Sequence, residues 1–263
     1  MKANKFKTVL VTGGAKRLGA EICKVFLADG WQIACHYKDS ATEAEAFKSH
    51  NMPSQNHVNV GLVETFKADL ADSAGLEHLF DAVVAHFGRL DCIINCASLF
   101  EPDEGISFTD EVYLKQHAVN VLAPIRLTQL LASHCKLNQK IGVAVQILDQ
   151  KVDNLNPDYF SYTLSKLALK DSIKLQAQAL APNVRVLGVS PGLMYLSGPQ
   201  TQENFDKASK VNLLKTPIEP RLVAKACLDL VSNPAINGAI VNVDNGQHLV
   251  PLGRDVMFLV DTL

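Results

Sequence analysis

The residues with the clearest capacity for chemistry are a tyrosine and a lysine one helical turn apart, Tyr162 and Lys166. Side chains four positions apart on a helix project from the same face. An ammonium beside a phenol favours the phenolate and draws the tyrosine pKa below its usual value near ~10, which suits a proton donor. The same spacing also occurs in ordinary helix surface pairs, so its meaning depends on the rest of the chain.

A carboxylate, Asp149, precedes Tyr162 by 13 positions at the end of an apolar run. If the fold brings this carboxylate beside the tyrosine, its charge opposes the effect of Lys166 and keeps the phenol protonated. It could also relay protons from solvent, which suits delivery of a proton to the nitrogen of a C=N bond. The alternative is that Asp149, or the nearby Asp153, is a turn or helix-capping residue.

The elements that must position these residues follow an alternating pattern of short β-branched runs and longer segments with helical periodicity. This alternation implies right-handed crossovers and a parallel sheet covered on both faces. We therefore predict an α/β protein with a Rossmann-like, doubly wound, seven-stranded parallel sheet in a single domain over residues 1–263. The expected strands are Thr8–Thr12, Gln32–His36, Glu64–Ala68, Leu90–Asn95, Gly142–Leu148, Val184–Val189 and Gly238–Val243, and the expected helices are Gly19–Ala28, Leu76–Phe87, Val112–Ser133, Tyr162–Leu180 and Pro220–Val231.

Two stretches do not fit the alternation. Residues 49–62 are polar and predict a loop before the third strand. Residues 192–218 follow the sixth strand, and ligands of open α/β sheets bind beyond the carboxyl ends of the strands. The second stretch is therefore expected to act as a lid.

A glycine-containing turn, Thr12 to Gly19, follows the first expected strand. Glycines allow a tight turn, and the helix that follows offers free N–H groups to a pyrophosphate. The alternative is a plain strand-to-helix connection.

After the second expected strand, Lys38 stands where an NAD-binding protein usually has a carboxylate. Together with Arg17 it predicts a cationic pocket for a 2′-phosphate, although Asp39 could instead make Lys38 part of a solvated surface pair.

These motifs resemble the short-chain dehydrogenase/reductase family. The turn is similar to its TGxxxGxG motif, with Arg17 replacing the second glycine as in pteridine reductases and bacterial dihydromonapterin reductases. Those pteridine reductases also have Asp where most of the family has the catalytic serine, at Asp149, but they carry a basic residue where this chain has Asp39. Further landmarks follow in the family's order: Ala68-Asp69-Leu70, Asn95-Cys96-Ala97-Ser98-Leu99-Phe100, Asn120, Tyr162xxxLys166 and Ser190-Pro191-Gly192-Leu193.

The resemblance implies an NADPH-dependent reductase that transfers hydride to a pterin, whether dihydromonapterin, dihydrobiopterin, dihydrofolate or an oxidised pterin. It implies that Tyr162 donates the proton, that Lys166 binds the nicotinamide ribose and tunes the tyrosine, that Asp149 assists protonation and that Asn120 holds a water in the relay. The implied substrate residues are Ser98, Phe100, Asp149, Tyr162 and Leu193. The implied NADP(H) residues are Gly13, Lys16, Arg17, Leu18, Gly19, His36, Tyr37, Lys38, Ser40, Asp69, Leu70, Asn95, Ala97, Ser98, Tyr162, Lys166, Pro191 and Gly192.

Alternatives stay open at several of these points. Phe100 is expected to stack on the pterin ring, or else to pack into a neighbouring loop. The protein could reduce another carbonyl or imine, or it could be a non-catalytic NADP-binding regulator, which the intact Tyr162 and Lys166 argue against. The family commonly forms tetramers, so a homotetramer is expected. The apolar C-terminal stretch 251–263 needs burial, and a neighbouring subunit is one surface that could supply it.

Composition bounds the remaining classes. A formal charge of −2 gives no field that would attract nucleic acid or an anionic membrane, so a small-molecule partner is expected. Six cysteines without a CxxC pair, several of them inside apolar runs, predict reduced thiols rather than disulfides or a metal site. The N-terminus runs into a strand without the apolar stretch of a signal peptide, which predicts a cytoplasmic protein.

Overall fold

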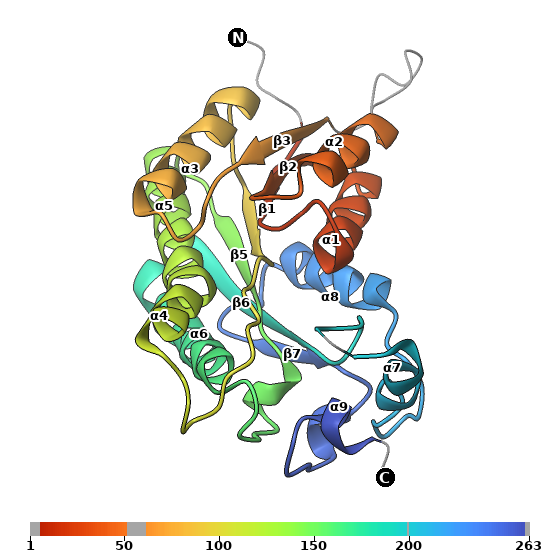
Figure 1. Ribbon diagram of the computed structural model, residues 1–263. Helices are drawn as coiled ribbons and strands as arrows, with labels where there is room; N and C mark the ends of the chain where they lie inside the picture. Colours follow the sequence, from red (N-terminus) through yellow and green to blue (C-terminus); the bar gives the residue numbers. More distant parts are fainter. Residues whose placement is uncertain (1–5, 52–61, 199, 261–263) are drawn as a thin grey trace.

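The structure, a computed structural model, describes residues 6–51, 62–198 and 200–260. Its centre is a seven-stranded, wholly parallel sheet with the order β3-β2-β1-β4-β5-β6-β7 (Figure 1). This confirms the predicted doubly wound sheet, and each strand lies within two residues of its expected bounds. The strands are β1 Thr8–Val11, β2 Gln32–Tyr37, β3 Val63–Lys67, β4 Cys92–Asn95, β5 Gly142–Ile147, β6 Val184–Pro191 and β7 Ile240–Val243.

Helices cover both faces of the sheet and bury two apolar layers. One layer lies between the sheet and α1 and α8, and the other lies between the sheet and α3, α5 and α6 (Figure 1). Strands buried on both faces read as continuous apolar runs, which explains why the sequence located them well. The helices are α1 Arg17–Ala28, α2 Ala41–His50, α3 Ser73–Phe87, α4 Asp110–His117, α5 Ala123–Leu137, α6 Phe160–Leu180, α7 Gln202–Ala208, α8 Pro220–Ser232 and α9 Val256–Leu259.

The segment expected as one helix over Val112–Ser133 is instead interrupted. A π-helical turn, Ala118–Leu122, separates α4 from α5. Pro124 lies in the first turn of α5 and has no N–H to donate to the carbonyl of Asn120, as a continuous α-helix would require. Such turns are frequent at functional sites, and this one carries Asn120.

Helices α2, α7 and α9 were not predicted. The expected polar loop 49–62 overlaps the end of α2, and its residues 52–61 lie outside the described part of the chain. The expected lid, 192–218, contains α7. All six cysteines are free thiols, five of them buried. Among the described residues, no helix is long and apolar enough to cross a bilayer.

Candidate active site

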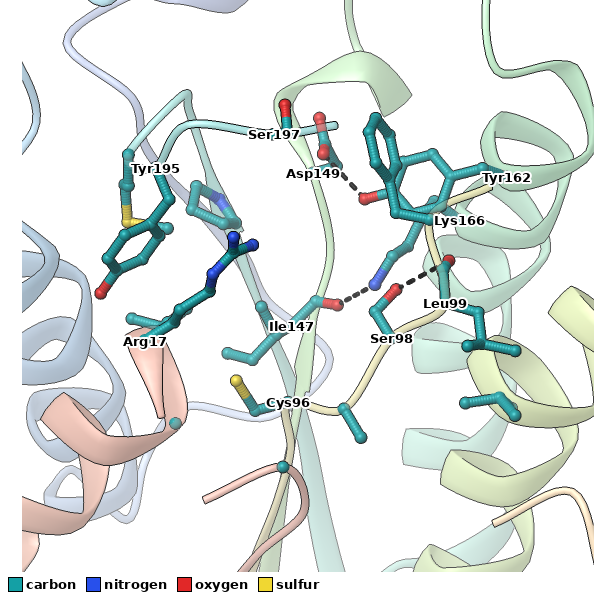
Figure 2. A pocket seen from close by; sticks show the side chains of 18 of the residues that line it. Arg17, Cys96, Ser98, Leu99, Ile147, Asp149, Tyr162, Lys166, Tyr195 and Ser197 are labelled. Atoms are coloured by element: carbon teal, nitrogen blue, oxygen red, sulfur yellow. Dashed lines mark hydrogen bonds between the residues drawn. The ribbon is translucent and has the colours of Figure 1, made fainter. Parts of the chain in front are cut away.

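A cavity of about 940 Å³ opens at the carboxyl ends of the central strands. It lies where the strand order reverses between β1 and β4, the usual ligand position in an open α/β sheet. Every residue that the sequence assigned to the site lines this cavity except Asn95 and Asn120. In Figure 2, Arg17 and Tyr195 lie on one side of it and Asp149, Tyr162 and Lys166 on the other.

Tyr162 and Asp149 are joined by a hydrogen bond. The Tyr162 hydroxyl donates to Asp149 Oδ2 at 2.8 Å (Figure 2), and Asp149 Oδ1 accepts from the backbone N–H of Lys151 at 2.9 Å. The carboxylate therefore caps the short 3₁₀ turn Gln150–Val152 with one oxygen and holds the phenol with the other. The two interpretations of Asp149 are compatible, because each oxygen has its own partner.

Burial controls the protonation of this pair. It raises the Tyr162 pKa well above its usual value, and the charge of Asp149 raises it further. The expectation that Lys166 lowers the tyrosine pKa is therefore wrong, whereas the opposing effect of Asp149 is confirmed. Burial also raises the Asp149 pKa, against the two hydrogen bonds it accepts. Burial thus disfavours the ionised form of both side chains, and the phenol proton lies in the hydrogen bond between their oxygens.

Lys166 is buried beneath the tyrosine. Its Nζ donates to the carbonyl of Ile147 at 2.8 Å and lies 5.7 Å from the centre of the Tyr162 ring. Burial lowers its pKa to about 8, although the charge of Asp149 acts in the opposite direction. The lysine thus has one fixed backbone partner and faces the ring rather than the hydroxyl.

Asn120 lies behind the cavity wall. Its Oδ1 accepts from the Leu99 N–H at 2.8 Å and from the Ser98 hydroxyl at 3.2 Å, and its Nδ2 donates to the Leu99 carbonyl and to Ser165 Oγ. The side chain therefore fixes the backbone after β4, and the water-holding role stays a prediction. Asn95 is also buried in the sheet, and neither of its side-chain polar atoms has a hydrogen-bond partner.

The turn after β1 is held by His36. Its Nδ1 accepts from the Gly13 N–H at 3.1 Å, and its Nε2 faces the Ala68 carbonyl at 3.2 Å, which fixes the neutral tautomer with the proton on Nε2. Burial lowers the His36 pKa to about 4. His36 is thus an uncharged support for the turn. A Cβ on Gly19 would collide with the Gly13 carbonyl oxygen, so this close approach requires glycine.

Two cations lie at the mouth of this turn. Arg17 adopts a left-handed backbone, φ 50°, which is uncommon for a residue with a side chain and is often found at functional sites. Its Nη2 donates to the Leu196 carbonyl at 3.2 Å, and its guanidinium lies 5.9 Å from the Tyr195 ring centre. Lys38 pairs with Asp69 at 2.8 Å rather than with Asp39. This bond lowers the Asp69 pKa and raises that of Lys38.

Phe100 lines the cavity beside Tyr162. Its ring stacks on Tyr159 with centroids 4.1 Å apart and meets Tyr162 edge-on at 4.6 Å. It therefore packs on a neighbouring segment, as the second expectation had it, and 38% of its surface stays exposed. Stacking on a pterin ring stays a prediction.

Comparison with known proteins supports the same assignment. Residues 13–248 match the profile of the family described as enoyl-(acyl carrier protein) reductase. The chain belongs to the short-chain dehydrogenase/reductase family. A solved structure of the FolM alternative dihydrofolate reductase 1 from Brucella canis, complexed with NADP, superposes with a TM-score of 0.86 and 31% identity, over 92% of this chain and 94% of that one.

Two curated members of the short-chain dehydrogenase/reductase family show that the similarity spans different substrates. Pteridine reductase 1 of Leishmania tarentolae is 29% identical, over 91% of this chain and 96% of its own length. The 3-oxoacyl-[acyl-carrier-protein] reductase FabG of Thermotoga maritima is 24% identical, over 91% and 97%. Membership of the family therefore gives the reaction class but not the substrate.

Sequence reasoning missed the part of the cavity wall that comes from the C-terminal stretch. Asp255 and Val256 line the cavity, as does Lys151 after β5. Only burial of the apolar stretch was predicted, with a neighbouring subunit as one possible surface. Its described part packs on its own chain, where Val256 and Val260 form a small cluster with Ala208 of α7. No local sequence pattern marks Asp255, because it reaches the cavity only when the C-terminal segment packs beside Lys151, about a hundred positions earlier in the chain.

Proposed function

We propose that this protein is an NADPH-dependent reductase of a pterin C=N bond. The observation that carries the proposal is the 2.8 Å hydrogen bond from Tyr162 to Asp149, the position where most of the family has serine. The structural relative from Brucella canis, named as an alternative dihydrofolate reductase, and the Leishmania pteridine reductase support a pterin or folate as the substrate.

The site has the features that NADPH needs. The tight turn at Gly13 and Gly19 brings the backbone close to the N-terminus of α1, where free N–H groups can donate to the oxygens of a pyrophosphate. Arg17 and Lys38 line the same end of the cavity, and both suit a 2′-phosphate. When bound, NADPH supplies the hydride.

Tyr162 delivers the proton in this mechanism. Its raised pKa keeps the phenol protonated, so it donates only as the substrate nitrogen gains electron density. Asp149 orients the hydroxyl through its Oδ2. After Tyr162 has given its proton to the substrate nitrogen, Asp149 takes up a proton from solvent and passes it to the phenolate, which restores the phenol. Lys166 holds its ammonium 5.7 Å from the centre of the Tyr162 ring and would bind the ribose of the nicotinamide nucleotide when NADPH is present.

The charge of Asp149 favours a nitrogen acceptor over a ketone. A ketone oxygen gains negative charge as hydride arrives, and a neighbouring carboxylate repels it. A pterin nitrogen that accepts a proton ends neutral, and the ring's N–H and amino groups can donate to the carboxylate. Asp149 therefore raises the barrier to ketone reduction and lowers the barrier to pterin reduction.

One alternative has specific support. The 3-oxoacyl reductase relative favours a carbonyl substrate, for which Arg17 and Asp149 would have other uses. The non-catalytic regulator has no such support, because Tyr162, Asp149 and Lys166 form a connected buried group at the cavity.

An Asp149→Ser variant tests the proposal. We expect dihydropterin reduction to fall at least about tenfold, a modest share of what acid–base groups contribute, while ketone reduction stays level or rises. Specific activity is measured on dihydropterins, dihydrofolate, ketones and acyl thioesters, with NADPH binding as the check on folding. Asp153→Ser is the matched control, because Asp153 pairs with Lys170 and does not line the cavity. Unchanged pterin turnover, or a wild-type preference for ketones, would overturn the proposal.

A further inference from the structure

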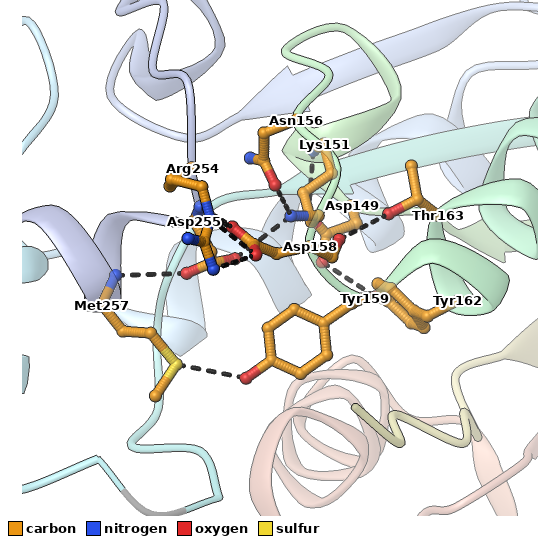
Figure 3. Close-up of polar contacts among 10 residues, drawn as sticks. All are labelled: Asp149, Lys151, Asn156, Asp158, Tyr159, Tyr162, Thr163, Arg254, Asp255 and Met257. Carbon is orange, nitrogen blue, oxygen red and sulfur yellow. Dashed lines mark hydrogen bonds and ion pairs between the residues drawn. The ribbon is translucent and has the colours of Figure 1, made fainter. Parts of the chain in front are cut away.

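An ion pair between Lys151 and Asp255 lines the substrate end of the cavity, and the proposed mechanism does not use it. Lys151 Nζ donates to Asp255 Oδ2 at 3.2 Å and to Asn156 Oδ1 at 2.7 Å (Figure 3). The Lys151 side chain is only 3% exposed and that of Asp255 only 17%. Both residues line the cavity, although they lie about a hundred positions apart in the chain.

The fold gains little from such a pair. Removing two charges from water costs several kcal/mol per ion, and apolar residues of similar size often stabilise a protein as well or better. A pair enclosed on all sides by the core would be consistent with a structural role. This pair instead lies in the wall of a ligand cavity, where charged and polar groups fix the orientation of a bound molecule.

The pair adjoins the groups that would contact the substrate ring. The backbone N–H of Lys151 donates to Asp149 Oδ1, and its Nζ lies 5.6 Å from the centre of the Tyr159 ring. Tyr159 in turn stacks on Phe100. The aromatic wall, the proton-donating pair and the ion pair therefore share one end of the cavity.

The C-terminal segment holds the Asp255 carboxylate in a fixed position. Asp158 accepts from the Asp255 N–H at 2.6 Å and from Arg254 Nε at 2.8 and 2.9 Å (Figure 3). Asp255 Oδ1 caps α9 by accepting from the Met257 N–H at 3.2 Å. Pre-organisation of this kind reduces the entropy lost when a ligand binds.

We infer that Lys151 and Asp255 bind the polar edge of the substrate ring and that Asp255 is a specificity-determining residue, an inference that rests on the proposed function. An ammonium has three N–H donors and a carboxylate about four lone-pair sites, and the contacts above use two of each. Lys151 therefore donates to a ring oxygen or nitrogen, and Asp255 accepts from an adjacent amino or N–H group. The amino-oxo-pyrimidine half of a pterin has this pattern, whereas a simple ketone has no donor.

The expected discrimination follows from the cost of an unpaired polar group. A site built to bond a substrate N–H rejects an analogue without it, because the buried partner then loses its hydrogen bond. The effect belongs to substrate binding rather than to proton transfer, so it changes KM more than kcat.

Asp255→Asn is the sharpest variant. Asn caps a helix as well as Asp does, so α9 keeps its cap and the side chain keeps its size. We expect KM for a 7,8-dihydropterin to rise at least about tenfold, a typical loss for a hydrogen bond to a charged group. NADPH affinity, measured by its fluorescence, and turnover of a simple ketone or imine should change less than about twofold. The matched control is Asp153→Asn, which alters another Lys–Asp pair away from the cavity.

A substrate analogue separates recognition from loss of structure. Wild type should lose affinity at least about tenfold for a dihydropterin without the exocyclic amino group, and Asp255→Asn should lose almost nothing further. Equal losses in both proteins, or an unchanged KM in the variant, would overturn the inference while leaving the proposed function intact. If wild type reduces no pterin at all, the proposed function fails instead.

Discussion

The two ends of the cavity are built in different ways. At the cofactor end, the charged side chains stay near solvent: Lys38 and Asp69 are 49% and 44% exposed, and Arg17 is exposed. At the proposed substrate end, Tyr162 is 5% and Lys166 3% exposed, and the Lys151 and Asp255 side chains are 3% and 17% exposed. The cofactor end relies on backbone shape with charges at its rim, and the substrate end relies on buried titratable groups.

The difference teaches where substitutions should matter most. An exposed ion pair contributes about 0–1 kcal/mol, because water screens it and its side chains lose entropy. A buried hydrogen bond to a charged group contributes more, and breaking it leaves an unpaired group in a poorly solvated place. We therefore expect large effects at Tyr162 and graded, smaller effects at the cofactor rim.

The largest effect should come from Tyr162→Phe. The change removes the proton donor and little volume, so kcat should fall by ~10²–10⁴, the usual contribution of a general acid. NADPH binding should persist, because the cofactor end keeps its turn and its cations. Single-turnover kinetics and NADPH fluorescence measure the two separately. Near-normal turnover would contradict the role given to the buried group.

The preference for NADPH over NADH tests the cofactor end of the cavity. NADPH should support turnover at least tenfold better than NADH, equivalent to about 1.4 kcal/mol of differential transition-state binding. Arg17→Ala should remove most of this preference and Lys38→Ala a smaller part, because Lys38 already shares its charge with Asp69. Comparison of kcat/KM for both cofactors measures this. Equal kcat/KM for NADPH and NADH in wild type would contradict the proposed 2′-phosphate pocket.

The smallest expected effect is a pH dependence. Burial lowers the pKa of Lys166 to about 8, so its ammonium is lost at a lower pH than that of an exposed lysine. Because the ammonium would hold the nicotinamide ribose, kcat/KM should be constant below this pH and fall as pH rises through about 8. Arginine stays charged, so Lys166→Arg should move the decline to higher pH at a reduced maximum. A profile that stays flat well above pH 8 would exclude this role for Lys166.

Most of the correct predictions came from sequence patterns within a single strand or helix. The five inner strands were located because they are buried on both faces. The spacing of Tyr162 and Lys166 is a property of one helix. Even there the prediction failed where the environment decides: burial and Asp149, rather than Lys166, control the tyrosine pKa. The π turn at Asn120 could have been suspected from Pro124, whose missing N–H was visible in the sequence.

The sequence by itself determined the parallel sheet, the glycine turn before α1 and the placement of Tyr162 and Lys166 on one helix face, because all three depend on residue type and local spacing. The place of Asp149 beside Tyr162 was implied by the family resemblance. Only the tertiary structure decided that His36 is a neutral support, that Lys38 faces Asp69 and that the C-terminal segment brings Asp255 to Lys151. These outcomes depend on burial and on contacts between distant segments. The free energy of such contacts is set by the assembled surroundings rather than by any stretch of chain alone.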